Sequence, residues 1–456
     1  MSIGIDRIPR VPGWPLLGQL PEFRVARLEL LAQVPERYGP IARLRLGPVD
    51  VVLITDASLA RQVLVEQADA FTKSRALSRF ARPLLGNGLL TSEHDFHRRQ
   101  RKLLAPLFVR RDVTRWADEM VARGEAAVAR WPDGAVLDVA DEMMQLTLEI
   151  VGRTLFDLDI AADAAWLGHA LSAANRYTSV ETSRLAPLPL SWPTPGRVKN
   201  ARGIARVDVL VAQMIADRRR SGATGNDLLS LLVRARDEDD GRTMSDHEVR
   251  DEVMTMFLAG HETTANALSW TWLLLSGAPA IRSQFTQEVD RALDGRSPST
   301  DDLEALPLTL RILKESMRLY PPAYLLGRIA ERDVVVGDVA LTAGTTVGIN
   351  VYGMHRRPDV FPDPLRFDPD RFTPEREAAL PRSSYLPFGS GPRVCIGNHF
   401  ALMEAHLLLA TIGQRVTLDR IAGREPRPEP QLTLRPRELP MRVAPRAPAV
   451  PGRDVA

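Results

Sequence analysis

A stretch of about 30 residues, 246–275, carries apolar side chains at the three- and four-residue spacing of a helix. As a helix it spans roughly 45 Å at ~1.5 Å per residue, which is enough to cross a whole domain. Its centre, Ala259-Gly-His-Glu-Thr-Thr264, holds a glycine, a carboxylate and two adjacent β-branched residues, all poorly suited to a helix interior. Because places where local preferences are broken are often functional, we expect a site there.

The rest of the chain predicts a mainly α protein with small β-sheets (α+β). Helical spacing dominates from about residue 56 to 319, and one more helix is expected over 398–413. Alternation around Gly47-Pro48 predicts a hairpin, and the turn-rich sequence beyond Pro322 predicts further strands. The expected strands are 41–46, 49–55, 332–339 and 345–351, and short strand material from 435 leads into a proline-rich tail that we expect to be mobile.

Size and charge exclude several classes of protein. The 456 residues, 45% hydrophobic and 25% charged, are typical of a globular protein with one large or two ordinary domains, so disorder is excluded as the main state. There are 59 basic and 57 acidic residues, which gives a formal net charge of +2. This balance does not predict nucleic-acid binding.

The chain has one cysteine, Cys395. A single cysteine excludes an intramolecular disulfide, a cysteine-rich zinc site and a self-contained iron–sulfur cluster, and it fits a reducing compartment. The N-terminus has no apolar run long enough for a signal peptide, and the most apolar stretch, 265–280, is too short to cross a bilayer. We therefore expect a soluble, cytoplasmic chain without a membrane anchor.

Cys395 stands in Phe388-Gly-Ser-Gly-Pro-Arg-Val-Cys-Ile-Gly397, directly before the expected helix at 398. Glycines let the backbone approach a flat ligand, and a helix N-terminus lowers the pKa of a thiol. A single soft thiolate is the ligand that haem iron takes in proteins that cleave the O–O bond of dioxygen. A lone cysteine is otherwise usually a small buried hydrophobe, but the surrounding phenylalanine, glycines and arginine favour the ligand interpretation.

The pattern Phe-x-x-Gly-x-Arg-x-Cys-x-Gly is the haem-binding signature of the cytochrome P450 superfamily, and the chain resembles its soluble bacterial members over nearly its whole length. The resemblance implies a single domain: a triangular prism of about a dozen helices with a long central helix over the haem. A β-rich lobe, about 1–70 and 320–380, would pack on a helical lobe, and 440–456 would form the mobile tail. Haem b would be bound through Cys395 as the iron ligand, with Phe388, Gly389 and Gly397 around it.

Glu315-Ser-Met-Arg318 resembles the Glu-x-x-Arg motif of the same family. Spacing of three residues puts both side chains on one helix face, where they can form a charge-assisted pair. By the resemblance, Arg371 in Pro369-Asp-Arg-Phe372 would complete a three-membered network that helps to hold the cysteine loop. The implied role is structural.

The central stretch Ala259–Thr264 resembles the oxygen-activating turn of the family. The Thr263 hydroxyl can bond the carbonyl of Ala259 and open the helix locally, which would leave a groove at Ala259 and Gly260 over the iron for dioxygen as co-substrate. Glu262 and Thr263 would then relay protons. A zinc peptidase is not supported, because Ala265 stands where the second histidine of His-Glu-x-x-His must be.

His97 and Arg101, four residues apart, resemble the haem-propionate donors on an early helix of the family. Arg393 and Arg328 match two further propionate-binding positions. A propionate needs such partners because a buried carboxylate is otherwise poorly compensated. A metal pair of His94 with His97 is the alternative, and no third histidine is placed nearby to support it.

The same early helix presents basic residues that could equally form an ordinary solvated face. We expect them to dock an acidic ferredoxin or a flavodoxin-type electron donor, because the chain has no flavin or iron–sulfur module of its own. These residues are Arg98, Arg99, Lys102, Arg110 and Arg111.

The resemblance places substrate contacts in mostly apolar segments, which suits a small hydrophobic substrate of terpenoid, fatty-acyl or polyketide type. Those segments are 74–90, 175–191, 256–263, 323–326 and 432–434, with Leu77, Phe80, Leu84, Leu85, Leu89, Tyr324, Leu325 and Leu326 as the expected cavity wall. Half of the leucines could equally be ordinary core. Whether Arg75, Arg79 or Arg82 anchors a substrate carboxylate stays open.

The sequence thus predicts a monomeric haem-thiolate monooxygenase that inserts one atom of dioxygen into a C–H or C=C bond. A peroxide-driven relative is the nearest rival, and Glu262 together with Thr263 argues against it. A non-catalytic haem or ligand-binding protein is a second rival. A cysteine hydrolase using Cys395 with His399 or His406 is a third, and it would be colourless.

Overall fold

The computed structural model describes residues 3–74, 77, 81–182, 192–225, 227–236 and 241–446. Helices make up most of this part of the chain, as expected. The α-helices are α1 (Leu20–Val25), α2 (Arg27–Tyr38), α3 (Ala57–Arg61), α4 (Arg82–Leu85), α5 (His94–Leu104), α6 (Arg110–Val113), α7 (Ala117–Ala129), α8 (Val139–Phe156), α9 (Ala161–Thr182), α10 (Pro195–Arg220), α11 (Leu228–Arg234), α12 (Asp246–Ser276), α13 (Pro279–Leu293), α14 (Pro307–Leu319), α15 (Val351–Met354), α16 (Pro374–Ala379) and α17 (Asn398–Arg415). Short turns of other helix types include η2 (Gln62–Glu66), η5 (Ala105–Phe108), η6 (Thr114–Trp116), η8 (Pro369–Phe372) and η9 (Gly391–Arg393). The described part thus holds seventeen α-helical segments instead of about a dozen, because pieces as short as α4, α6 and α15 are counted.

The strands form four small sheets. A five-stranded sheet has the order β2-β3-β9-β6-β4, two three-stranded sheets have the orders β1-β8-β7 and β10-β13-β5, and β11 pairs with β12. The strands are β1 (Ile3–Gly4), β2 (Ile41–Leu46), β3 (Val49–Ile54), β4 (Phe71–Lys73), β5 (Val136–Asp138), β6 (Leu326–Ala330), β7 (Val334–Val336), β8 (Val339–Leu341), β9 (Thr346–Ile349), β10 (Val416–Arg420), β11 (Pro428–Pro430), β12 (Leu434–Pro436) and β13 (Pro440–Pro445).

Two expectations about strands are wrong. The stretch 332–339 is the first half of a hairpin, because Gly337 takes φ +61° and turns the chain between β7 and β8. The tail does not begin at 440, because β13 pairs with both β10 and β5 and buries Met441 and Val443. Residues 447–456 lie outside the described part.

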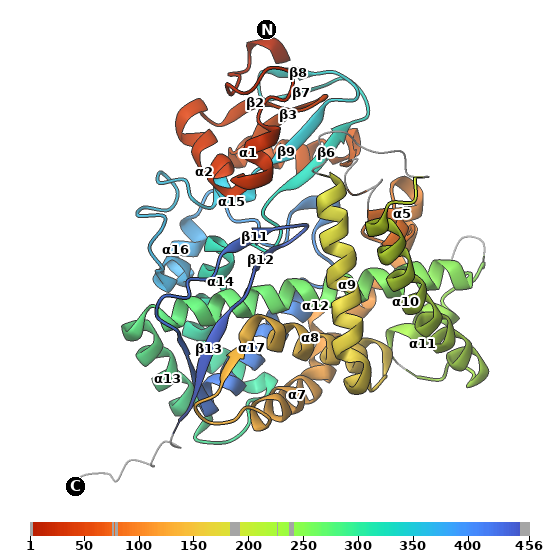
Figure 1. Cartoon of the computed structure of the whole chain (residues 1–456), viewed down its shortest axis with the longest axis vertical. Coiled ribbons are helices and arrows are strands. Elements are labelled where there is room, and N and C mark those ends of the chain that lie inside the picture. The colour runs from red at the N-terminus through yellow and green to blue at the C-terminus, as the bar shows by residue number, and fades with distance from the viewer. Residues whose placement is uncertain are drawn as a thin grey trace.

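α12 is the axis of the helical lobe. It begins at Ser245 with a capping box to Glu248 and runs 31 residues to Ser276. Figure 1 shows it crossing the middle of the molecule, with the sheet that holds β2, β3, β9 and β6 on one side, and with α7, α13, α17 and strand β13 on the other. It is buried around much of its circumference, as a helix that is apolar on several faces must be, and it packs on α8, α14 and α17 in the largest core cluster.

Candidate active site around Cys395

Cys395 lies in the loop between η9 and α17. Its N–H donates to the carbonyl of Phe388 at 2.9 Å. Gly391 has φ +72°, and a Cβ there would lie 1.9 Å from the carbonyl oxygen of Leu64 in η2, so this position requires glycine. A Cβ on Gly397 would meet no atom of the described residues within 4 Å. Gly391 therefore packs the loop onto η2, and Gly397 borders open space.

The Cys395 side chain has accessible surface, although protein atoms enclose it on nearly every side. An accessible group that is enclosed in this way borders an interior space. Burial raises the pKa of the thiol, and the Gly397 N–H and the Arg101 charge offset this only in part. The start of α17 thus lowers the thiol pKa as expected, through the Gly397 N–H, but burial outweighs this contribution in the polypeptide alone. A coordinated metal would reverse the balance, because a ligating thiol loses its proton.

Five basic residues gather beside this loop. Lys73 and Arg328 face each other in register on β4 and β6. Arg101 donates a hydrogen bond to the carbonyl of Val394 at 2.8 Å. The five side chains are close enough for their charges to affect one another's pKa values. The cluster brings together the four sequence-predicted positions and one more: Lys73, His97, Arg101, Arg328 and Arg393.

The pKa values show how unfavourable this crowding is. Burial, and then repulsion from Arg393, lowers the pKa of Lys73 to about 7, of His97 to about 3 and of Arg328 to about 10. Glu93 is the acid that pairs directly with Arg393. A surplus of buried cations with one neutral histidine donor fits an anionic group, and two propionates of a haem meet that requirement.

Lys73 was missed in the sequence. Its Nζ donates to the carbonyls of Leu89 and Ser92, each at 2.9 Å, and its side chain is 9% exposed. The available signal was its scarcity, because the chain has only four lysines, but scarcity alone does not place a residue at a site.

The central turn of α12 contains the predicted Thr263 hydrogen bond but not the predicted local opening of the helix. The Thr263 hydroxyl donates to the Ala259 carbonyl at 2.7 Å, as expected. The helix is nevertheless continuous across these residues. Gly260 serves packing, because a Cβ there would lie 2.9 Å from a methyl of Val151 on α8.

Glu262 is 1% exposed, and its partners come from distant segments. Its carboxylate accepts hydrogen bonds from Asn175 on α9 and from Thr433 between β11 and β12. Neither partner was singled out in the sequence as a partner of Glu262, since they lie 87 and 171 residues away along the chain.

The three-membered network is present. Arg318 binds Glu315 through two nitrogens at 2.7 and 2.8 Å, with both side chains fully buried, and Arg371 Nε lies 3.4 Å from Glu315 Oε1. Arg318 also donates to the carbonyl of His355, whose Nε2 accepts from the Leu386 N–H at 2.9 Å. The network therefore reaches the segment that leads into the cysteine loop.

The expected cavity wall is only partly supported. Tyr324 is 3% exposed, and its hydroxyl bonds Arg27 and the carbonyl of Gln431, so it belongs to the core of the β-rich lobe. Leu84 and Leu85 are ordinary core residues. Arg82 is exposed and bonds Asn87 at 3.2 Å, which does not support a buried carboxylate anchor. Arg75, Arg79 and Phe80 lie outside the described residues.

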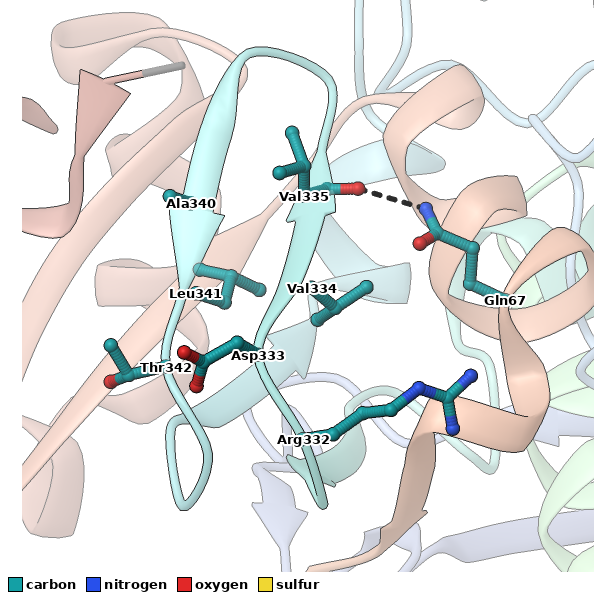
Figure 2. Close-up of a pocket in the computed structure, with 8 residues that line it drawn as sticks. All are labelled: Gln67, Arg332, Asp333, Val334, Val335, Ala340, Leu341 and Thr342. Carbon is teal, nitrogen blue, oxygen red and sulfur yellow. Dashed lines mark hydrogen bonds between the residues drawn. The ribbon is translucent and has the colours of Figure 1, made fainter.

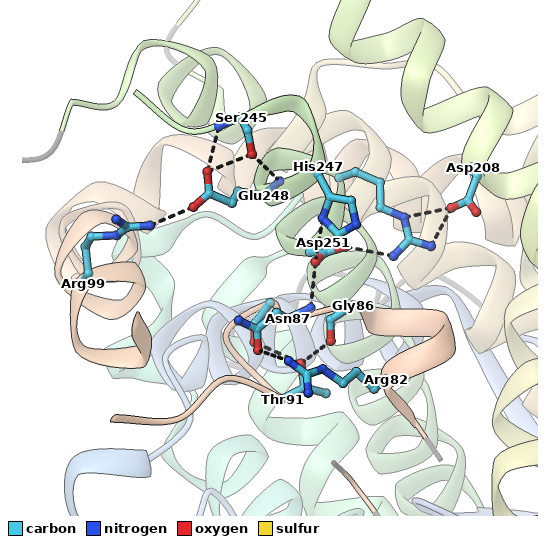
Figure 3. Close-up of polar contacts among 12 residues, drawn as sticks. Arg82, Gly86, Asn87, Thr91, Arg99, Asp208, Ser245, His247, Glu248 and Asp251 are labelled. Carbon is cyan, nitrogen blue, oxygen red and sulfur yellow. Dashed lines mark hydrogen bonds and ion pairs between the residues drawn. The ribbon is translucent and has the colours of Figure 1, made fainter. Parts of the chain in front are cut away.

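Two surface hollows are present whose lining residues do not include Cys395. One of about 400 Å³ is formed by the β7–β8 hairpin beside Gln67, which donates to the Val335 carbonyl (Figure 2). The other, of about 520 Å³, lies where α4, α10 and α12 meet. There Asp251 accepts from the Asn87 N–H and pairs with His247 (Figure 3). Neither hollow is lined by a residue of the basic cluster.

The rival hydrolase has no dyad in the described structure. His406 Nε2 lies 2.9 Å from the carbonyl of Leu306 in the core, and His399 is exposed. No helix in the described ranges combines the length and the apolar character that a bilayer-spanning segment needs.

Comparison with known proteins agrees with this geometry. The Cytochrome P450 family model matches residues 9–441. The chain is 40% identical to cyclooctatin synthase of Streptomyces melanosporofaciens, with 95% of each chain covered, and 36% identical to pentalenene oxygenase of Streptomyces avermitilis, with 90% of this chain and 91% of that one covered. It is 37% identical to cyclooctat-9-en-7-ol 5-monooxygenase of Streptomyces melanosporofaciens, over 90% of this chain and 89% of that one.

Among solved structures, the haem domain of cytochrome P450DA superposes with a TM-score of 0.87 at 29% identity and covers 98% of this chain and 99% of that one. This confirms the expected fold, with its long central helix and small sheets. Members of the family carry haem on a cysteine thiolate and depend on redox partners. The chain therefore belongs to the cytochrome P450 family and is a monooxygenase of that family.

Proposed function

We propose that this monooxygenase carries haem b and uses dioxygen to oxidise a cyclic terpenoid at a C–H or C=C bond. The observation that carries the proposal is the Cys395 thiol, enclosed yet accessible, beside a surplus of buried cations. The substrate class is supported by relatives named for acting on cyclooctat-9-en-7-ol and on pentalenene. Fatty-acyl and polyketide substrates are the other classes that the sequence predicts.

In the overall reaction one oxygen atom enters the substrate and the other leaves as water, which consumes two electrons and two protons. The haem, when bound, supplies the activation of dioxygen, and a thiolate ligand favours O–O cleavage. The chain's own residues would divide the remaining work. Cys395 would hold the iron, the basic cluster would hold the propionates, and Glu262 with Thr263 would hold and move protons.

We expect purified protein to give its largest substrate-induced spin-state change with cyclic terpenes such as pentalenene. The reason is that an apolar ligand that enters the site would displace water from it. The measurement is an absorption titration against panels of terpenes, fatty acids and macrolides, followed by product analysis with a ferredoxin and its reductase. A response restricted to fatty acids or macrolides would contradict the terpenoid assignment. Turnover with peroxide but not with the ferredoxin would favour the peroxide-driven rival.

The electron donor would dock on a basic face, which we define as Arg98, Lys102, Arg110, Arg111 and Arg115. All five are exposed, with Val109 as an exposed apolar residue among them. Helix α6 and turn η5 contact α17, the helix that begins just after Cys395. Arg99 was expected on this face but does not belong to it, because Arg99 is half-buried and binds Glu248 of α12 at 2.8 Å.

Reversing two charges of this face, Arg110→Glu with Arg111→Glu, is expected to raise the ferredoxin concentration for half-maximal turnover by roughly tenfold at low salt, because surface charges act mainly on association. The effect should shrink as salt is added. Arg220→Glu on α10, a similarly exposed arginine outside the face, is the matched control. Equal effects of the two charge reversals, or turnover that ignores ionic strength, would rule out docking on the basic face. Monomeric state and cytoplasmic location remain predictions.

A further inference from the structure

Among the described residues, the hydrogen bonds to the Glu262 carboxylate come from neutral donors outside its own helix. Asn175 Nδ2 on α9 donates to Oε1 at 2.5 Å and lies 2.6 Å from Oε2, and the Thr433 hydroxyl donates to Oε1 at 2.5 Å. Asn175 is 2% exposed and Glu262 1%. A buried carboxylate loses most of its hydration, so these contacts decide the direction in which it points.

The orientation of the Asn175 amide follows from the charge of its partner. With Nδ2 against Glu262, the other amide atom, Oδ1, is buried and finds no hydrogen-bond partner among the described residues. The flipped amide would set Oδ1 against the carboxylate oxygens instead. An unpaired buried acceptor is unfavourable. In the observed orientation Oδ1 carries this cost, while Nδ2 donates to the Glu262 carboxylate.

Thr433 is oriented by a second amide. Asn266 Nδ2 donates to Thr433 Oγ1 at 3.1 Å, and Asn266 lies four residues after Glu262 on the same face of α12. Because the Thr433 oxygen accepts from Asn266, its own proton is directed to Glu262. The β11–β12 connection is thereby joined to α12 at the carboxylate.

The titratable neighbour on α12 does not supply a charge. His261 is fully buried, and its Nδ1 contacts the Phe257 carbonyl. Burial lowers the pKa of His261 below its usual value, so the ring is neutral at pH 7. Glu262 therefore depends on hydrogen bonds, and not on a paired cation in its own helix, for its position.

We propose that Asn175 and Thr433 are positioning residues that fix the Glu262 carboxylate for proton delivery beside Thr263. This rests on the proposed function of Glu262 as a proton carrier and adds two residues from α9 and from the β11–β12 connection to it. Removing either donor takes a hydrogen bond from the carboxylate and lets the Glu262 side chain turn away from this orientation.

Infrared difference spectroscopy of the purified holoenzyme tests this without a substrate. The carboxyl bands of Glu262 are identified by subtracting the spectrum of Glu262→Gln. In Asn175→Ala and Thr433→Val we expect the carboxylate stretching bands of Glu262 to shift and broaden relative to the wild type, because the carboxylate loses a hydrogen-bond donor and takes up more than one orientation. Thr271→Val is the matched control, because it removes a buried α12 hydroxyl that bonds only to Ala267 in its own helix. Identical Glu262 bands in all of these proteins would overturn the proposal.

Turnover with pentalenene, a ferredoxin and its reductase gives the second readout. Asn175→Ala and Thr433→Val should form product roughly tenfold more slowly and release more hydrogen peroxide per NADH, with Thr271→Val unchanged. Asn175→Asp is the diagnostic variant. Two adjacent carboxylates hold a shared proton at low pH, so its activity should recover as the pH falls, whereas that of Asn175→Ala should not.

The outcomes separate this inference from the function it rests on. If Glu262→Gln forms as much product per NADH as the wild type does, Glu262 is not the proton carrier. If Glu262→Gln is impaired but the Asn175 and Thr433 variants match Thr271→Val, the carrier role stands and the positioning role is wrong. Absence of recovery at low pH in Asn175→Asp also contradicts positioning. The carbon monoxide spectrum of each variant verifies that the haem site is intact.

Discussion

Replacing Cys395 with alanine is expected to abolish the spectral shift that a thiolate ligand gives to the ferrous carbon monoxide complex, together with monooxygenase activity. Cys395 is the only thiol in the chain, so no second sulfur can substitute for it. The thiolate also supplies the electron density that favours O–O cleavage, so a protein that still bound porphyrin would not oxidise substrate. The measurement is the absorption spectrum of the reduced protein under carbon monoxide.

Cys395→Ser is the companion variant, because its hydroxyl is close to the thiol in shape but is a harder ligand. We expect it to lose the same shift. A circular dichroism spectrum like that of the wild type would establish that both variants are folded. Retention of the thiolate-type shift in Cys395→Ala would refute the ligand assignment.

The second large effect is expected from Arg318→Ala, which should lower the free energy of unfolding by about 3–5 kcal/mol. Glu315 and Arg318 are both fully buried and joined by two short hydrogen bonds. The substitution leaves a buried carboxylate with the Asp368 N–H as its donor and Arg371 Nε at 3.4 Å. Haem retention should fall as well, since Arg318 reaches the cysteine loop through His355. Denaturant titration and the ratio of haem to protein absorbance measure the two effects.

Arg311→Ala is the control on the same helix. Arg311 pairs with Asp370 of η8, but that carboxylate is 64% exposed, so the pair is screened by water and is expected to contribute only ~0–1 kcal/mol. Similar losses of stability in Arg311→Ala and Arg318→Ala would show that α14 is merely sensitive to truncation. In that case the buried network would not be the support of the cysteine loop.

Features that the sequence predicted well are local. The helix from 246 to 275 is found as α12, and the Thr263 bond to Ala259 and the Glu315–Arg318 pair span only four and three residues. Such spacings fix which side chains share a helix face, whatever the rest of the fold does. The cysteine motif is equally local and carried the family assignment.

Features that the sequence did not reveal depend on residues far apart. Asn175 and Thr433 meet at Glu262 only because α9 and the β11–β12 connection both pack on α12, and nothing near either residue signals this. The pKa of the Cys395 thiol could not be predicted from the sequence for a different reason. A helix start is visible in sequence, but the burial that outweighs it at Cys395 is a property of the assembled fold.

The register of β4 against β6 sets two basic side chains, Lys73 and Arg328, directly across from each other, with Arg393 also close. Like charges at directly opposed positions destabilise the pairing of β4 with β6 until an anion binds between them. The prosthetic group is then a partner in folding as much as in chemistry. A cell short of porphyrin should accumulate less of this enzyme, whatever the rate at which its message is translated.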